Sequence, residues 1–311
     1  MEFDKSKYST NISNLKELAG RIKAIIADIY EAVAPPEIKG RKGVERMIMS
    51  DVEVISVAIL GELMTIDSER AWYFFCRKNL SNVFPAFCER SRYNRIRRNL
   101  HAVIRRCYQE ITVMVSDSQV KLVDSMPIPV CKFGRAHFHK TFRGYGANYG
   151  RCASKKETYL GYKLHLLCDS NGYPADFLLT SANVDDRAPV LKLVENHRML
   201  ALYADKGYSG DDFSNRILTL TGIRMYPLPK SNQLQPPESK ELRQHIFKAR
   251  RRIETTNSQL TDHLGIQRVR AKSLWGLMTR LASKLLAFAV AFLINSCMHK
   301  PNPVCIKSLI F

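Results

Sequence analysis

The 311-residue sequence predicts an α/β fold: a three-layer α/β domain preceded by an all-α N-terminal domain. Up to about residue 116, apolar residues recur at three- and four-residue spacing, which is typical of amphipathic helices. From residue 118 onward, short segments rich in β-branched residues alternate with helical patterns and turn residues. These observations predict a helical domain over 1–116, an α/β domain over 117–298 and a C-terminal tail over 299–311.

The helical domain contains one clear helix start and one strongly basic segment. Ser50 and Glu53 have the spacing of a capping box, which predicts a helix beginning after Ser50. Between Cys88 and Cys107 the chain carries seven arginines and one acidic residue, Glu89. This density of positive charge favours a DNA-contacting helix over a merely solvated one. The arginines expected to contact DNA are Arg92, Arg95, Arg97 and Arg98.

The second domain has the predicted element order β-β-β-α-β-α-β-α. The first strand lies within 119–130, and the next two, 161–168 and 175–182, flank a turn at 169–172 and predict a hairpin. A helix over 186–197, a strand over 199–205, a helix after residue 210, a strand over 222–228 and a last helix follow. Right-handed connections and helices on both faces of the sheet give an RNase H-like three-layer core, because ribonuclease H has this order of elements.

Composition limits the partners and the compartment. The 48 Lys and Arg residues outnumber 29 acidic residues, and the resulting net charge of +19 indicates a polyanionic partner, first of all nucleic acid. The eight cysteines form no close CxxC pair, which fits reduced thiols in the cytoplasm. The longest uninterrupted apolar segment, 285–294, has ten residues against the roughly 20 of a membrane-spanning helix. It therefore predicts a buried core helix and no membrane association.

Three acidic residues are candidates for catalysis. Asp124 and Asp205 each end an apolar segment expected to be a strand, and Glu254 lies on a basic helix beside an apolar stripe. If the three carboxylates converge, cations must neutralise them, and an all-oxygen ligand set favours Mg²⁺, with Mn²⁺ as a substitute, over zinc. Two ions about 4 Å apart would activate the attacking oxygen and stabilise the leaving oxygen at phosphorus. The predicted catalytic and metal-binding residues are Asp124, Asp205 and Glu254.

The segment 131–156 is rich in glycine and holds seven Lys or Arg and no acidic residue. It is predicted to be a long irregular loop that becomes ordered on DNA, with aromatic side chains available to stack on bases. An alternative is zinc binding by Cys131, His137, His139 and Cys152, although their spacing matches no standard site. Helical periodicity places Arg250, Glu254, Asn257 and Thr261 on one face of the last helix, where Arg250 is expected to contact DNA or to pair with Glu254. The other expected DNA contacts are Lys140, Arg143, Lys155, Lys156, Lys206 and Arg251.

Four motifs carry a resemblance to a known family. VDSMPIPVC, LTSANVDDRAP, YADKGYSG and RRRIETTNSQL, in this order, resemble signatures of bacterial insertion-sequence DDE transposases, closest to the group named nine-eight-two. The similarity spans about residues 118–298 and implies an RNase H-like catalytic core, Mg²⁺ dependence and terminal inverted repeats as substrate. Asp124, Asp205 and Glu254 match the catalytic triad. Related transposases carry a tyrosine and a lysine where this chain has Phe247 and Thr261.

The sequence thus predicts an enzyme that cleaves DNA at element ends with water and then joins the freed 3′-hydroxyl to target DNA. A homodimer is expected in the DNA complex, because two element ends must be brought together. The expected location is the bacterial cytoplasm, on the nucleoid when DNA is bound. The alternatives are an RNase H-like nuclease that cuts without joining and an inactive transposase-derived regulator that only binds the repeats.

Overall fold

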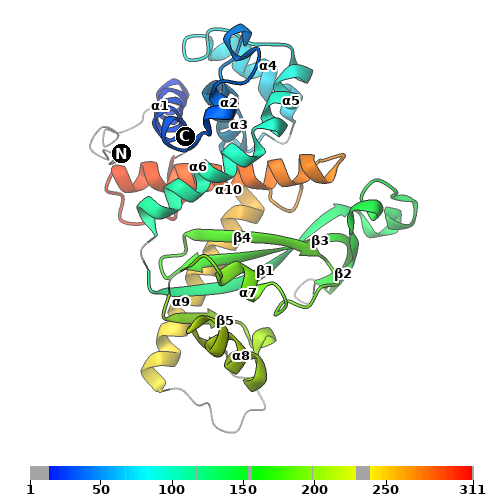
Figure 1. Ribbon diagram of the computed structural model, residues 1–311, viewed down its shortest axis with the longest axis vertical. Coiled ribbons are helices and arrows are strands. Elements are labelled where there is room, and N and C mark those ends of the chain that lie inside the picture. Colours follow the sequence, from blue (N-terminus) through cyan, green and yellow to red (C-terminus); the bar gives the residue numbers. More distant parts are fainter. Residues whose placement is uncertain are drawn as a thin grey trace. The chain divides into compact units, whose positions relative to one another are not determined.

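The structure, a computed structural model, describes residues 14–66, 68–116, 118–152, 156–197, 199–228 and 239–309, without the side chains of Arg143, Lys240 and Arg243. The chain forms two compact units (Figure 1). The helical unit comprises Met1–Val115 and Gln259–Phe311, and the α/β unit comprises Ser116–Ser258. The predicted boundaries at 298 and 299 therefore differ from those of the structure, because the whole segment after Ser258 belongs to the helical unit.

The last long helix forms the core of the helical unit. Of α10 (Leu274–Cys297), 18 residues are buried, and the helix packs against α3 (Asp51–Leu63) and α6 (His101–Val115). A helix that is apolar on all sides needs neighbours on all sides, which explains why it joins this unit. The other helical segments of the unit are α1 (Leu15–Val33), α2 (Pro36–Lys39), η2 (Val44–Arg46), α4 (Glu69–Asn79), α5 (Arg90–Asn99), the π-helix η6 (Gln259–His263) and η7 (Ile306–Leu309).

By length and composition alone, α10 could cross a membrane, but 89% of its most apolar window is buried inside the protein. This burial matches the core helix predicted around residues 285–294. The predicted start of α3 is also confirmed. Ser50 Oγ accepts a hydrogen bond from the Glu53 backbone, and the Glu53 carboxylate accepts one from the Ser50 backbone.

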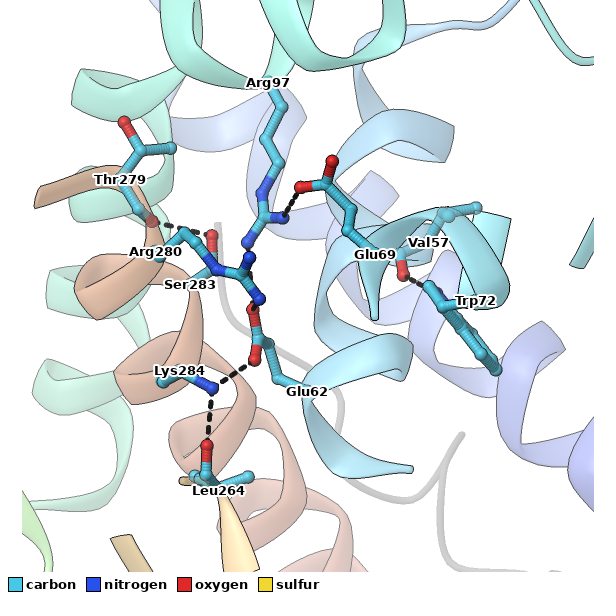
Figure 2. A network of polar contacts seen from close by, with 10 residues as sticks. All are labelled: Val57, Glu62, Glu69, Trp72, Arg97, Leu264, Thr279, Arg280, Ser283 and Lys284. Atoms are coloured by element: carbon cyan, nitrogen blue, oxygen red, sulfur yellow. Dashed lines mark hydrogen bonds and ion pairs between the residues drawn. The ribbon is translucent and has the colours of Figure 1, made fainter. Parts of the chain in front are cut away.

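A buried carboxylate links α3, α5 and α10 (Figure 2). Glu62 accepts hydrogen bonds from Arg97 Nη2 at 3.0 Å and from Lys284 Nζ, and Arg280 Nη2 lies 3.8 Å away. Burial alone would raise the pKa of Glu62, but Lys284, Arg280 and Arg97 outweigh burial and lower the pKa to about 2. Arg97 also donates to Glu69 at 3.2 Å. Glu62 is therefore a charged residue whose burial depends on its cations.

Arg97, one of the arginines predicted to contact DNA, is almost fully buried. Its side chain is only 5% exposed and is held by Glu62 and Glu69, so it belongs to the core of the helical unit. Along the chain Arg97 resembles Arg95 and Arg98, which are exposed. Arg97 lies one helical turn after the buried Tyr93, and this periodicity places it on the inner face of α5.

The α/β unit is built on a six-stranded mixed sheet in the order β2-β3-β1-β5-β6, with β4 also paired to β3. The pairs of β3 are antiparallel, whereas β1, β5 and β6 run parallel. This mixed α/β arrangement is compatible with an RNase H-like core. The strands are β1 (Val120–Cys131), β2 (Asn148–Cys152), β3 (Glu157–Asp169), β4 (Pro174–Ser181), β5 (Ala201–Ala204) and β6 (Arg224–Pro227), and the helices are α7 (Val190–Val194), α8 (Asp211–Thr221) and α9 (Lys240–Ser258).

The sheet has a helical layer on each face. Val123, Leu202 and Ala204 pack in one cluster with residues of α7 and α8. Leu122 and Tyr203, their neighbours along the strands, line a cavity with residues of α9. Successive residues of a strand point to opposite faces, so the next residues on the α9 side are at positions 124 and 205.

Two predicted elements differ in extent from the observed ones, and a third is confirmed. The helix expected over 186–197 is shortened to α7, because Pro189 at its N-cap has no N–H to continue a helix before it. The loop expected over 131–156 contains β2 and the 3₁₀ turns η3 (Phe133–Phe138) and η4 (Arg143–Tyr145). The hairpin is confirmed: β3 pairs with β4, and Gly172 adopts a φ of 88° in the turn.

Candidate active site

Asp124 and Asp205 follow a pair of residues in register on adjacent parallel strands. Val123 of β1 is paired with Ala204 of β5, and this is the last pair of the ladder. Asp205 caps the N-terminus of the 3₁₀ turn η5 (Lys206–Tyr208), where it accepts a hydrogen bond from the Lys206 backbone at 2.7 Å. Asp124 does not end its strand as predicted, because β1 continues to Cys131. Only its pairing with β5 ends there, which leaves both carboxylates at the edge of the parallel ladder.

Helix α9 brings three polar side chains to these carboxylates. Asn257 Nδ2 donates to Asp124 Oδ2 at 2.7 Å, and Arg250 Nη1 donates to Asp205 Oδ1 at 2.9 Å. Arg250 Nε donates to Glu254 Oε1 at 3.0 Å. The common face predicted for positions 250, 254 and 257 is thus observed, since residues three and four apart share a helix face.

Buried apolar residues fix α9 in this orientation. Ile246 and Ile253 are 2% and 3% exposed, and both line a small cavity together with Asp124, Asp205 and Glu254. The cavity volume is about 40 Å³, which is enough for a few water molecules at most. All three predicted acidic residues therefore line one cavity, which we call the acidic pocket.

The electrostatics of the acidic pocket centre on Asp124. Burial raises the pKa of its carboxyl group to about 6, and the negative charge of Asp205 acts in the same direction. Hydrogen bonds from the Ser125 backbone and Asn257, together with the charge of Arg250, oppose this shift without cancelling it. Asp124 thus carries a charge that its surroundings compensate only in part.

The donors around Asp124 fit a hard cation. Asp124 and Asp205 offer carboxylate oxygens, and Asn257 Oδ1 is buried without a hydrogen-bond partner in the described structure. Oxygen ligands of this kind suit Mg²⁺ or Mn²⁺. However, no three His, Cys, Asp or Glu side chains within the described ranges are grouped closely enough to hold a metal ion. The Arg250 guanidinium instead bridges Asp205 and Glu254 in this conformation.

The alternative of a zinc site is not supported by the structure either. Cys131, His137, His139 and Cys152 all belong to the described part of the chain, and they form no group that could hold a metal ion.

The residues expected to contact DNA lie at several places. Lys155 and the side chain of Arg143 lie outside the described residues. Arg250 is half-buried in the acidic pocket, whereas Arg92, Arg95, Arg98, Lys140, Lys156, Lys206 and Arg251 are exposed.

One contact at the site was not predicted. Helical periodicity places Asn257 on the face of Glu254 but predicts no role for it, and its bond to Asp124 joins residues 133 positions apart. The available signal was the spacing of three residues from Glu254, which identifies the face but not what that face meets.

The fold and the site together define a mixed α/β protein with an acidic pocket at the edge of its parallel strands. A family model described as a transposase DDE domain matches residues 115–274, which is just over half of the chain. The chain belongs to this family, and its function is that of a transposase acting on DNA. No curated protein matches the sequence.

Proposed function

We propose that the protein catalyses metal-dependent cleavage of DNA strands at the terminal inverted repeats of an insertion sequence and transfers the freed ends to target DNA. The observation that carries the proposal is the lining of one cavity by Asp124, Asp205 and Glu254 in a member of the transposase DDE family. We assign these residues as the catalytic and metal-binding triad, with two Mg²⁺ or Mn²⁺ ions per site. The order of the four sequence motifs supports a place in the nine-eight-two group.

Each reaction step forms one bond to phosphorus and breaks another. Water attacks first and frees a 3′-hydroxyl, which then attacks a phosphodiester of the target DNA. Bound ions would supply Lewis-acid stabilisation of the attacking and leaving oxygens. The remaining tasks fall to the chain, whose residues must hold the carboxylates in place and bind the DNA backbone.

Asn257 and Arg250 have distinct parts in this proposal. Asn257 fixes one oxygen of Asp124 through its Nδ2, and its buried Oδ1 has no hydrogen-bond partner in the described structure and is a further oxygen that suits a cation. Arg250 neutralises Asp205 and Glu254 before the site is loaded. When Arg250 releases these carboxylates, its planar guanidinium is available for a DNA phosphate, which it can bind with two parallel hydrogen bonds.

Exposed basic residues support binding of DNA around the site. Lys206 and Arg251 directly follow two of the residues that line the acidic pocket, and Lys140 and Lys156 come from the basic segment between β1 and β3. Such side chains bind phosphates without reading sequence. Two copies of the chain would hold the two element ends, which is the reason for proposing a dimer in the DNA complex.

The test is a cleavage and strand-transfer assay with the full chain, labelled duplexes carrying the element end, and Mg²⁺. Asp124→Asn, Asp205→Asn and Glu254→Gln should each abolish both steps. Asp212→Asn is the matched control, because Asp212 is an exposed acidic residue in the first turn of α8 and does not line the acidic pocket. Cleavage that survives any of the three triad substitutions would overturn the assignment of that residue.

The same assay separates the alternatives. A protein that cuts the element end without joining it to target DNA is an RNase H-like nuclease. A protein that binds the inverted repeats but neither cuts nor joins is a regulator derived from a transposase.

A further inference from the structure

The helical unit contains a basic groove, separate from the acidic pocket, whose walls come from distant parts of the chain. One wall is α5 (Arg90–Asn99), and the other is the segment 270–280, which includes the start of α10. The cavity volume is about 690 Å³, many times that of a single phosphate group. The sequence predicts DNA contact for arginines of α5 but no role for residues 270–280.

The groove is strongly positive. Seven of its fifteen described lining residues are Lys or Arg, and Glu69 is the one acidic residue among them. Glu69 is bound to Arg97, so its charge is already compensated. Arg95, Arg98, Arg270 and Lys272 are exposed, and Arg90 is half-buried. Like charges that line a concave surface raise the local potential and attract an anionic partner.

The floor of the groove adds to this charge. Arg97 and Arg280 line the groove, and each forms an ion pair with the buried Glu62 (Figure 2). The Nε atoms of both arginines are buried without a hydrogen-bond partner in the described structure. With Lys284, three cations face the two carboxylates of Glu62 and Glu69, so the network keeps an excess of positive charge beneath the groove.

The start of α10 contributes further donors. Ser273 caps the helix by accepting a hydrogen bond from the Gly276 backbone, and both residues line the groove. The first turn of a helix presents backbone N–H groups and a partial positive charge, which favours anions. The hydroxyl and amide groups of Ser91 and Asn94 on the opposite wall are also suitable partners for phosphate oxygens.

The lining favours the backbone of duplex DNA over a single strand. No aromatic side chain is among the described lining residues, so the groove offers no surface on which unpaired bases could stack. Duplex DNA keeps its bases stacked inside and presents phosphates at regular spacing. Arg92 lies on another face of α5, where it lines a separate cavity with residues of the segment 38–47.

We propose that the groove between α5 and the start of α10 binds the phosphate backbone of duplex DNA independently of its sequence, with Arg95 and Arg270 as contacts from opposite walls. The groove deepens the proposed function and rests on it, since DNA is taken as the substrate. Besides the basic residues around the acidic pocket, it gives the protein a second DNA-binding surface, which lies in the helical unit. Part of this surface comes from residues that follow α9 in the chain.

The test measures how binding of a fluorescent DNA duplex of random sequence by the full chain depends on salt. Each phosphate contact contributes about 0.9 to the slope of log K against log salt concentration. Arg95→Ala with Arg270→Ala should therefore lower the slope by about 1.8 relative to the unmodified chain. Arg95→Lys with Arg270→Lys should restore most of it, because the charges return.

The matched control is Arg46→Ala with Arg77→Ala. Both arginines are exposed residues of the helical unit, the Arg46 side chain to 87%, and neither lines the groove. The control should leave the slope unchanged. An equal drop in both double variants would overturn the groove, because the effect would then reflect net charge alone. The duplex assignment would be overturned if binding of a single-stranded RNA depended on Arg95 and Arg270 while binding of the duplex did not.

Failure of the groove and failure of the proposed function give different results. If the unmodified chain cuts and joins DNA but the Arg95→Ala, Arg270→Ala variant keeps the slope of the unmodified chain, only the proposed groove is refuted. If the unmodified chain binds duplex DNA through Arg95 and Arg270 but neither cuts nor joins it, only the catalytic proposal is refuted.

Discussion

Replacing Asp124 by asparagine is expected to stabilise the α/β unit near neutral pH. The folded protein raises the pKa of this carboxyl group from 3.8 to about 6, mainly through burial. A raised pKa means that the folded state binds the proton more tightly than the unfolded state. The stability that the protein gains when Asp124 is protonated is complete below about pH 4 and is lost as the pH rises through about 6.

The size of the effect follows from the shift. About two pKa units at 1.36 kcal/mol each correspond to about 3 kcal/mol of stability that the unmodified protein loses between about pH 4 and pH 7. Asp124→Asn cannot ionise and avoids this loss. A flip of the Asn257 amide would place its Oδ1, which lacks a partner, opposite the new side-chain amide. For a unit of this size, 3 kcal/mol corresponds to about 6–12 °C in Tm.

The assay is urea unfolding across this pH range without divalent ions, followed by circular dichroism in the far ultraviolet. The quantity of interest is the difference in free energy of unfolding between Asp124→Asn and the unmodified protein, which should grow by about 3 kcal/mol with rising pH. Asp212→Asn, at an exposed site, serves as the control. A difference that stays constant with pH would refute the assignment of a half-buried, partly compensated charge to Asp124.

Three further predictions concern charge and packing. Arg250→Ala should tighten Mn²⁺ binding by up to about 30-fold, measured by electron paramagnetic resonance, because it removes two partly exposed ion pairs worth at most about 1 kcal/mol each. Unaltered binding would mean that Arg250 does not compete with the ion. Lys284→Met should lower the free energy of unfolding by about 3–5 kcal/mol, because Glu62 loses a buried cation, and adding Glu62→Gln should recover part of the loss in urea unfolding. A double variant no more stable than Lys284→Met would contradict this. Gly61→Ala should lower the Tm, because the new methyl group would lie 2.5 Å from Trp72 Cδ1, and the Trp72 indole is held by its bond to the Val57 carbonyl. A Tm raised by the better helix propensity of alanine would show that the indole can move.

Local patterns in the sequence determine much of this protein. The apolar segments before Asp124 and Asp205, the turn at 169–172 and the capping box at Ser50 predict elements that the structure contains. These features depend on residues a few positions apart, so a short segment contains the needed information. The placement of positions 250, 254 and 257 on one helix face is of the same kind.

Only the tertiary structure decides which of these faces meet. Asn257 contacts Asp124 across 133 positions, and Glu62 meets Lys284 across 222, separations at which no periodicity links the partners. The same holds for the buried place of Arg97 among exposed arginines and for the packing of α10 with the N-terminal helices. A buried charge is stable only beside its partners, and those partners come together only when the whole chain folds.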